Sequence, residues 1–174
     1  MNLKKYTNII IILAFAFGIT FVSINSNTET VFAKKIAEIE LSGNEEIPSV
    51  ITSATGKATF RTAVNDTIIK YKINITGFPD ATGAHIHIGK VGENGEPIVD
   101  LLTDAKENPT KEGMVIRGNI TDTDLMRTMQ GKGISDLISV LDSGNTYVNI
   151  HTEKNPNGEI RGQLDSESEG TSVQ

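Results

Sequence analysis

The alternation of aliphatic and polar residues along residues 37–164 predicts a series of short β-strands. Side chains on a strand point alternately to its two faces, so a regular alternation indicates one apolar face and one polar face. Turn residues separate eight such segments, which span residues 37–42, 56–64, 67–76, 84–89, 98–102, 113–120, 146–152 and 159–164. Short strands at this spacing are typical of an all-β antiparallel sandwich or barrel.

One stretch, residues 121–141, departs from the strand pattern. Its large apolar residues recur at helical spacing and are interrupted by Gly131 and Gly133, which predicts two short helices. Thr121 or Thr123 can cap the first helix, and Ser135 or the residue before it begins the second. We expect the apolar residues of this helical insertion to contact the core rather than to line a ligand groove. These residues are Leu125, Met126, Met129, Ile134, Leu137, Ile138 and Leu141.

Residues 1–33 have the layout of a secretory signal peptide. Lys4 and Lys5 precede an apolar run over residues 9–24, and a small-x-Ala cleavage pattern ends at Ala33. The alternative to cleavage is a retained N-terminal membrane anchor, because the apolar run is only slightly short of the membrane's hydrocarbon thickness. In either case the lysines favour an extracytoplasmic domain, which is secreted or anchored to the outer face of the cell membrane.

Residues 34–165 then form one domain, and residues 166–174 form a tail rich in Ser, Glu and Gly that we expect to be disordered. The chain has 16 basic and 22 acidic residues, of which two and one lie before residue 34, so the mature charge is 14 minus 21, or −7. An acidic domain without clustered Lys or Arg is a poor ligand for nucleic acids. The absence of cysteine excludes disulfides, thiolate metal ligands and cysteine nucleophiles.

All three histidines of the chain lie in strand-like segments, where they alternate with aliphatic residues. His85 and His87 share residues 84–89, and His151 lies in residues 146–152. If these two strands are neighbours, the three imidazoles form a candidate first shell for copper or zinc. The alternative is a polar sheet face on which the histidines make hydrogen bonds without a metal.

The last two predicted strands read as a hairpin whose polar face supports this candidate site. Its polar side chains are Tyr147, Asn149, Glu159, Arg161 and Gln163, together with His151. In one register His151 lies opposite Glu159, a carboxylate that can orient or join a metal shell. In the other it lies opposite Arg161, a guanidinium that opposes cation binding. The sequence alone does not choose between the two registers.

Three Asn-x-Thr sequons, at Asn65, Asn74 and Asn119, are candidate glycosylation sites if the host glycosylates exported proteins. The segment Gly92–Glu96 lacks the dense carboxylates of a calcium loop, so it reads as an acidic turn. No nucleophile elbow, phosphate loop or dinucleotide fingerprint is present, and no catalytic residue is therefore assigned.

Several motifs in order resemble the CHRD (chordin-type) domain family. They include Ser42–Pro48, Thr52–Gly56, Ala84–Gly89, Tyr147–Thr152 and Asn155–Gln163, and the resemblance extends from Ala37 to Leu164. It implies an exported domain with an immunoglobulin-like or superoxide-dismutase-like β-sandwich. The growth-factor binding of chordin is associated with cysteine-rich modules, which this cysteine-free chain lacks, so that activity is not carried over.

Three functions are compatible with these features. The first is a non-enzymatic binding module at the cell surface, with an extracellular ligand or an envelope component as its partner and a copper or zinc ion at the three histidines. The second is a copper-dependent redox enzyme that resembles superoxide dismutase. The third is a purely structural envelope or adhesion domain.

Overall fold

The computed structural model describes residues 35–62 and 66–164, which are organised around antiparallel strands. The predicted signal segment, the C-terminal tail and the sequon residue Asn65 lie outside these residues. The strands are β1 Lys35–Ser42, β2 Thr55–Thr62, β3 Ile69–Thr76, β4 Gly83–Ile88, β5 Pro97–Asp100, β6 Lys106–Pro109, β7 Gly113–Ile120, β8 Thr146–His151 and β9 Ile160–Leu164. The helical elements are the 3-10 turns η1 Gly43–Glu45, η2 Asp122–Asp124 and η3 Arg127–Met129, and the helix α1 Ile134–Asp142.

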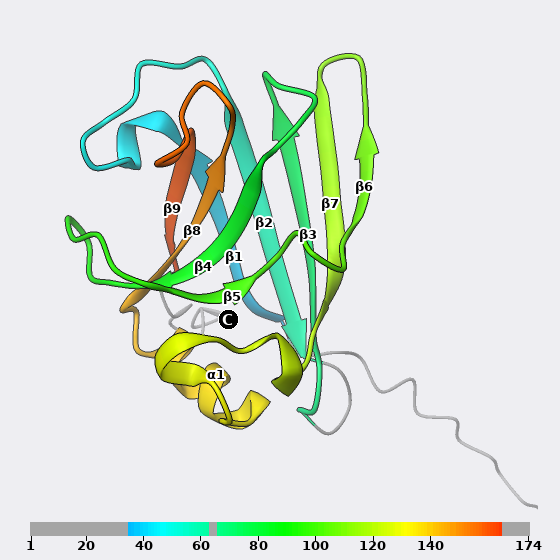
Figure 1. Cartoon of the computed structure of the whole chain (residues 1–174), viewed down its shortest axis with the longest axis vertical. Coiled ribbons are helices and arrows are strands. Elements are labelled where there is room, and N and C mark those ends of the chain that lie inside the picture. The colour runs from blue at the N-terminus through cyan, green and yellow to red at the C-terminus, as the bar shows by residue number, and fades with distance from the viewer. Residues whose placement is uncertain (1–34, 63–65, 165–174) are drawn as a thin grey trace, which may run out of the picture. The chain divides into compact units, whose positions relative to one another are not determined.

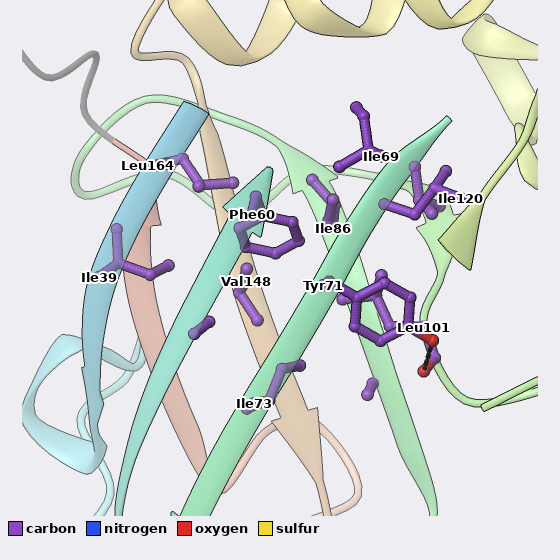
Figure 2. Packing of buried hydrophobic residues seen from close by; sticks show 14 of the residues in the cluster. Ile39, Phe60, Ile69, Tyr71, Ile73, Ile86, Leu101, Ile120, Val148 and Leu164 are labelled. Atoms are coloured by element: carbon purple, nitrogen blue, oxygen red, sulfur yellow. Dashed lines mark hydrogen bonds between the residues drawn. The ribbon is translucent and has the colours of Figure 1, made fainter. Parts of the chain in front are cut away.

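The strands pair into one sheet in the order β5-β4-β8-β9-β1-β2-β3-β7-β6 (Figure 1). The joint between β9 and β1 has a single paired position, Ser42 with Arg161, whereas β2 and β3 pair along their whole length. The sheet curls into a half-barrel, and its two halves face each other across the core. Figure 2 shows Phe60 and Tyr71 on one half opposite Ile86 and Val148 on the other.

The core is aliphatic and closely follows the predicted alternation. Phe60, Ile73, Ile86, Val148 and Ile150 are fully buried, as are many of their neighbours. Tyr71 is the polar exception, because its hydroxyl donates a hydrogen bond to the carbonyl of Leu101 at 2.7 Å (Figure 2). Burial of these side chains supplies the main favourable free energy of folding.

The all-β antiparallel prediction is confirmed, and each of the eight predicted segments overlaps an observed strand. The described strands form a single curled sheet, however, and the two separate sheets of the predicted sandwich are not seen among them. A ninth strand, β6, was not predicted, because all four of its residues are exposed and Lys106–Pro109 has no alternation to detect.

The helical insertion is confirmed in part. Its first half contains two 3-10 turns rather than a helix, and the second half is α1. Thr121 caps the first turn, since its backbone N–H and its hydroxyl both donate to Asp124. Leu125, Met129, Leu137 and Leu141 are buried, as expected for residues that contact the core.

Candidate metal centre

Pairing between β4 and β8 brings the three histidines onto one face of the sheet. Gly83 lies opposite His151, His85 opposite Asn149 and His87 opposite Tyr147. Because side chains alternate along each strand, all of these residues face away from Ile86 and Val148, which point into the apolar core. The predicted convergence of His85, His87 and His151 is therefore seen in the structure.

The ligand atoms of the three imidazoles lie within 4.8 Å of one another. His85 Nδ1 is 3.1 Å from His151 Nε2. Two nitrogens that each bind one zinc ion at about 2.0–2.1 Å lie about 3–3.4 Å apart at angles between square and tetrahedral, and copper has similar bond lengths. The spacing of this pair fits one shared ion once the proton of His85 is on Nε2, and the third ligand atom lies within 4.8 Å.

Backbone carbonyls fix the tautomers of two of the rings. His87 Nδ1 lies 2.9 Å from the carbonyl oxygen of Gly95, and His151 Nδ1 lies 3.0 Å from that of Pro156. A carbonyl oxygen only accepts, so each Nδ1 carries the proton and donates. Each Nε2 is then a lone pair, and a backbone carbonyl on the other nitrogen is the usual support for a metal-binding histidine.

The lone pairs at the centre of the triad are incompletely satisfied. Where the chain is described, His87 Nε2 is buried and has no hydrogen-bond partner. His151 Nε2 accepts a hydrogen bond from His85 Nδ1–H. The lone pair of His87 Nε2 lies near this hydrogen-bonded pair of rings and accepts no hydrogen bond itself. An unpartnered buried acceptor is costly, and this nitrogen is available as a ligand for an ion.

Burial keeps the three imidazoles neutral at pH 7. It lowers the pKa of His87 to about 4, although the Gly95 hydrogen bond acts in the opposite direction. Burial also lowers the pKa of His85 and of His151, opposed by the charge of Asp100 at His85 and by the Pro156 carbonyl at His151. Neutral imidazole is the form that ligates metals.

Two stacked side chains extend the site away from the histidines. The ring of Tyr147 stacks on His87 with centroids 4.8 Å apart and planes 12° apart. On Tyr147 lies the guanidinium of Arg161, whose Cζ is 3.4 Å from the ring centroid, a cation–π contact. Tyr147 and Arg161 are both 2% exposed, so this part of the predicted polar face is buried, whereas His151 is only half-buried.

The loop over residues 89–96, which contains the predicted acidic turn Gly92–Glu96, covers this polar interior. Arg161 donates to the carbonyl of Glu93 at 2.8 Å and to Asn94 Oδ1 at 3.0 Å. Gly95 accepts from His87, and its backbone N–H donates to the Tyr147 hydroxyl. A Cβ at Gly95 would collide with the carbonyl of Ile88, so only glycine allows this close approach.

The loop after β1 also covers this polar face, through contacts with Asn94 and Asn149. Asn94 Nδ2 donates to the carbonyl of Ile47, which ties the two loops together. Glu46 is buried and accepts a hydrogen bond from Asn149 Nδ2 at 3.3 Å. In Figure 1 the segment that follows β1 and the β8–β9 connection lie at the same end of the sheet, away from α1.

The structure chooses between the two predicted registers of the last hairpin. Arg161 pairs with Asn149, and the ladder ends at Ile150 with Ile160, so Arg161 is not opposite His151. Glu159 lies just before β9, one position beyond the last strand pair, and its carboxylate is bonded to residues other than the histidines. It accepts hydrogen bonds from Thr52, Thr152 and Asn155, which lower its pKa against the effect of burial.

The remaining predicted residues have structural surroundings of their own. Gln163 Nε2 donates to the carbonyls of Gly89 and Gly144, which holds two turns against β9. Asn74 lies on β3, and Asn119 lies exposed on β7. Both alternate with buried residues, so these two sequons are on the face of the sheet that points away from the apolar core. Among residues 35–62 and 66–164, no helix is long and apolar enough to cross a membrane.

The roles of Tyr147 and Gly95 were not predicted. Tyr147 was assigned to the polar face, yet nothing in the sequence indicated that it stacks between His87 and Arg161. The alternation Tyr147-x-Asn149-x-His151 was the available signal, since it placed all three on one face. The contact of Gly95 with His87 could not be predicted from the sequence, because the path of a loop brings the Gly95 carbonyl to the histidine.

Comparison with known families agrees with this arrangement. The family model described as CHRD domain matches residues 37–164. The chain belongs to the CHRD family. Both histidine strands and both covering loops lie inside the matched range, so the candidate metal centre is part of the CHRD domain itself. No curated protein and no solved structure matches this CHRD chain.

Proposed function

We propose that this CHRD protein is an exported, non-enzymatic module that holds one copper or zinc ion between His85, His87 and His151. The observation that carries the proposal is the buried, unpartnered lone pair of His87 Nε2, next to a second lone pair at His151 Nε2. Two of the rings are already in the ligating tautomer, so binding an ion requires a change of tautomer only at His85.

Location outside the cytoplasm is part of the proposal. It rests on the signal-like pattern of residues 1–33, and an N-terminal membrane anchor remains its alternative form. An extracellular ligand or an envelope component is the expected partner. Immunoblotting of culture medium, membrane and cytoplasmic fractions tests the location, and a product confined to the cytoplasm would contradict it.

A copper-dependent redox enzyme is the second candidate function. Its supporting observation is that His85 and His151 are only half-buried, so a bound ion keeps a side that faces solvent. Catalytic sites with three protein ligands keep an open position of this kind. Superoxide turnover by the copper-loaded protein distinguishes this function from simple binding.

The metal test uses the full chain, equilibrated separately with Zn²⁺ and copper, and measures bound metal by elemental analysis after removal of free ions. We expect one ion per chain. His151→Gln removes one ligand and should lower affinity by roughly 100-fold or more, because loss of even an outer-shell partner typically costs 10- to 100-fold. The matched control is Lys72→Gln, an exposed change on β3 that should leave the affinity unchanged.

Thermal unfolding provides a second readout of the same site. A metal present at about 100 times its Kd stabilises the folded state by roughly 2.7 kcal/mol. Wild type and Lys72→Gln should show this shift, and His151→Gln should not. Failure of the wild type to hold one ion, or equal affinity of wild type and His151→Gln, would remove the metal-binding proposal.

A further inference from the structure

The ligands of the candidate metal centre are neutral, so any fixed charge that acts on a bound ion comes from the residues around the ligands. Three imidazoles contribute no negative charge to a bound ion. The nearest buried cation is Arg161. Its guanidinium lies over the ring of Tyr147, which in turn stacks on His87. The two centroid distances, 3.4 and 4.8 Å, place the guanidinium carbon at most 8.2 Å from the centre of the His87 ring.

The charge of Arg161 opposes the effect of burial that raises the pKa of Glu46, so it is partly balanced by that carboxyl and not by a direct ion pair. Arg161 is 2% exposed, and the hydrogen bonds that it donates go to two neutral oxygens, the Glu93 carbonyl and Asn94 Oδ1. In the part of the chain that is described, no salt bridge includes Arg161. A buried guanidinium of this kind opposes a second positive charge nearby, and it does so more strongly as that charge increases.

The acidic groups near the site are not among its ligands. Asp100 pairs with His85 across β4 and β5; its two oxygens accept from Leu102 and Thr103, and its negative charge raises the pKa of His85 against the effect of burial. Glu46 accepts from Asn149, and Glu159 accepts from two threonines and an asparagine. None of these carboxylates belongs to the ligand cluster, which contains the histidines alone.

The geometry points to a monovalent ion: we propose that the His85–His87–His151 site holds copper as Cu(I) in preference to Cu(II) or Zn(II). This inference rests on the proposed metal-binding function. The cost of burying an ion rises with the square of its charge, so a neutral ligand set beside a fixed cation discriminates against divalent ions. Copper is accepted by imidazole ligands, and Cu(I) is its monovalent state.

Tyr147 is a positioning residue in this scheme. Its hydroxyl accepts from the Gly95 N–H at 3.0 Å, and its ring is held between His87 and the guanidinium. The stack therefore keeps the Arg161 charge at a fixed distance from the ligand His87. Arg161 acts through this field and does not touch the ion.

The test compares affinities of the full chain for Cu(I), Cu(II) and Zn(II), with Cu(I) supplied already reduced under anaerobic conditions and competed against a chromophoric Cu(I) chelator. We expect the wild type to bind Cu(I) at least tenfold more tightly than Cu(II) and Zn(II). In Arg161→Gln the ratio of Cu(II) to Cu(I) dissociation constants should fall about tenfold, which for one electron lowers the reduction potential by about 59 mV.

Two control variants separate charge from position. Arg161→Lys keeps the charge and should hold the ratio within about threefold of wild type. Arg117→Gln removes an exposed positive charge from β7 and should leave the ratio unchanged. If Arg161→Gln does not fold, the wild-type ratio and the Arg161→Lys ratio still decide the matter.

The outcomes distinguish this inference from the proposed function. Tighter binding of Cu(II) or Zn(II) than of Cu(I) would overturn the inference and leave metal binding intact. An Arg161→Gln protein with an unchanged ratio would overturn the role of the guanidinium. No binding of any of the three ions by the wild type would remove the proposed function itself, and the inference with it.

Discussion

The two faces of β4 and β8 differ more in chemistry than in exposure, although His85 and His151 on the polar face are only half-buried. On one face Ile86, Val148 and Ile150 are fully buried in the apolar core. On the other face His87, Tyr147 and Asn149 are 9%, 2% and 3% exposed, because two loops cover them. The alternation of aliphatic and polar residues therefore separates two interiors, where a strand pattern usually separates an interior from a surface.

The two interiors are stabilised in different ways. The apolar interior is held by packing, and its one buried tyrosine hydroxyl, at Tyr71, has a partner. The polar interior is held by hydrogen bonds to loop carbonyls, and it contains three of the unpartnered buried atoms of the described chain: Glu46 Oε1, His87 Nε2 and Asn149 Oδ1. Such atoms cost stability, so the polar interior is expected to stabilise the fold less than the apolar interior does.

Phe60→Ala should produce the largest effect and should affect only the apolar interior. Phe60 is fully buried, and its truncation should lower the free energy of unfolding by about 3–5 kcal/mol, measured by urea unfolding. The metal affinity of the folded fraction should stay within about twofold of wild type. A matching loss of affinity would show that the two interiors are coupled, and Phe60→Leu provides a milder form of the same change.

Glu46→Gln should change how stability depends on pH. Burial raises the pKa of Glu46 to about 7 from its ordinary 4.5, opposed by Arg161 and Asn149 and assisted by the charge of Glu159. The folded state then holds a proton that the unfolded state has released between these values, so stability falls as pH rises from about 4.5 to 7. The contribution is at most roughly 3 kcal/mol.

Glutamine cannot ionise, and its amide can donate to an unpartnered oxygen such as Asn149 Oδ1. Urea unfolding at pH 5 and pH 8 should therefore show a smaller loss of stability in Glu46→Gln than in wild type. Glu107→Gln, an exposed change on β6, is the control and should behave as wild type. Identical pH profiles for all three proteins would show that Glu46 is ionised in the folded state.

Gly83→Ala should produce the smallest effect and tests how tightly the polar interior is packed. An added Cβ would lie 3.1 Å from His85 Cε1 and 3.3 Å from His151 Cδ2, so one ring must move by a few tenths of an ångström. We expect metal affinity to fall by less than about tenfold, with a stability change below about 1 kcal/mol. Gly133→Ala is the control, because its Cβ would meet no atom closer than 3.8 Å.

Much of the strand content could be predicted from the sequence, because alternation of Ile86 and Val148 with histidine and asparagine is a local signal. The same signal placed His85, His87 and His151 on polar faces. It did not predict β6, whose exposed residues carry no pattern, or the single curled sheet, since the joint between β1 and β9 depends on strands at opposite ends of the domain.

The rest of the candidate site could not be predicted, because it depends on loops. Gly95 and Pro156 orient His87 and His151 through backbone carbonyls, which any residue type possesses. The hairpin register, which sets Arg161 opposite Asn149, follows from the turn geometry and from packing around Gly158. Polar alternation shows which side chains share a face, and only the path of the loops shows whether water reaches them.

The separation of His85 and His151 by 66 positions has a consequence for biogenesis. A chain that is being synthesised or threaded through a pore presents His85 and His87 long before the β8–β9 hairpin emerges. Until that hairpin joins β4, no ion can be shared by the three rings, and early capture of a stray metal by two histidines is weak. The three histidines can therefore form one site only after β8 has paired with β4.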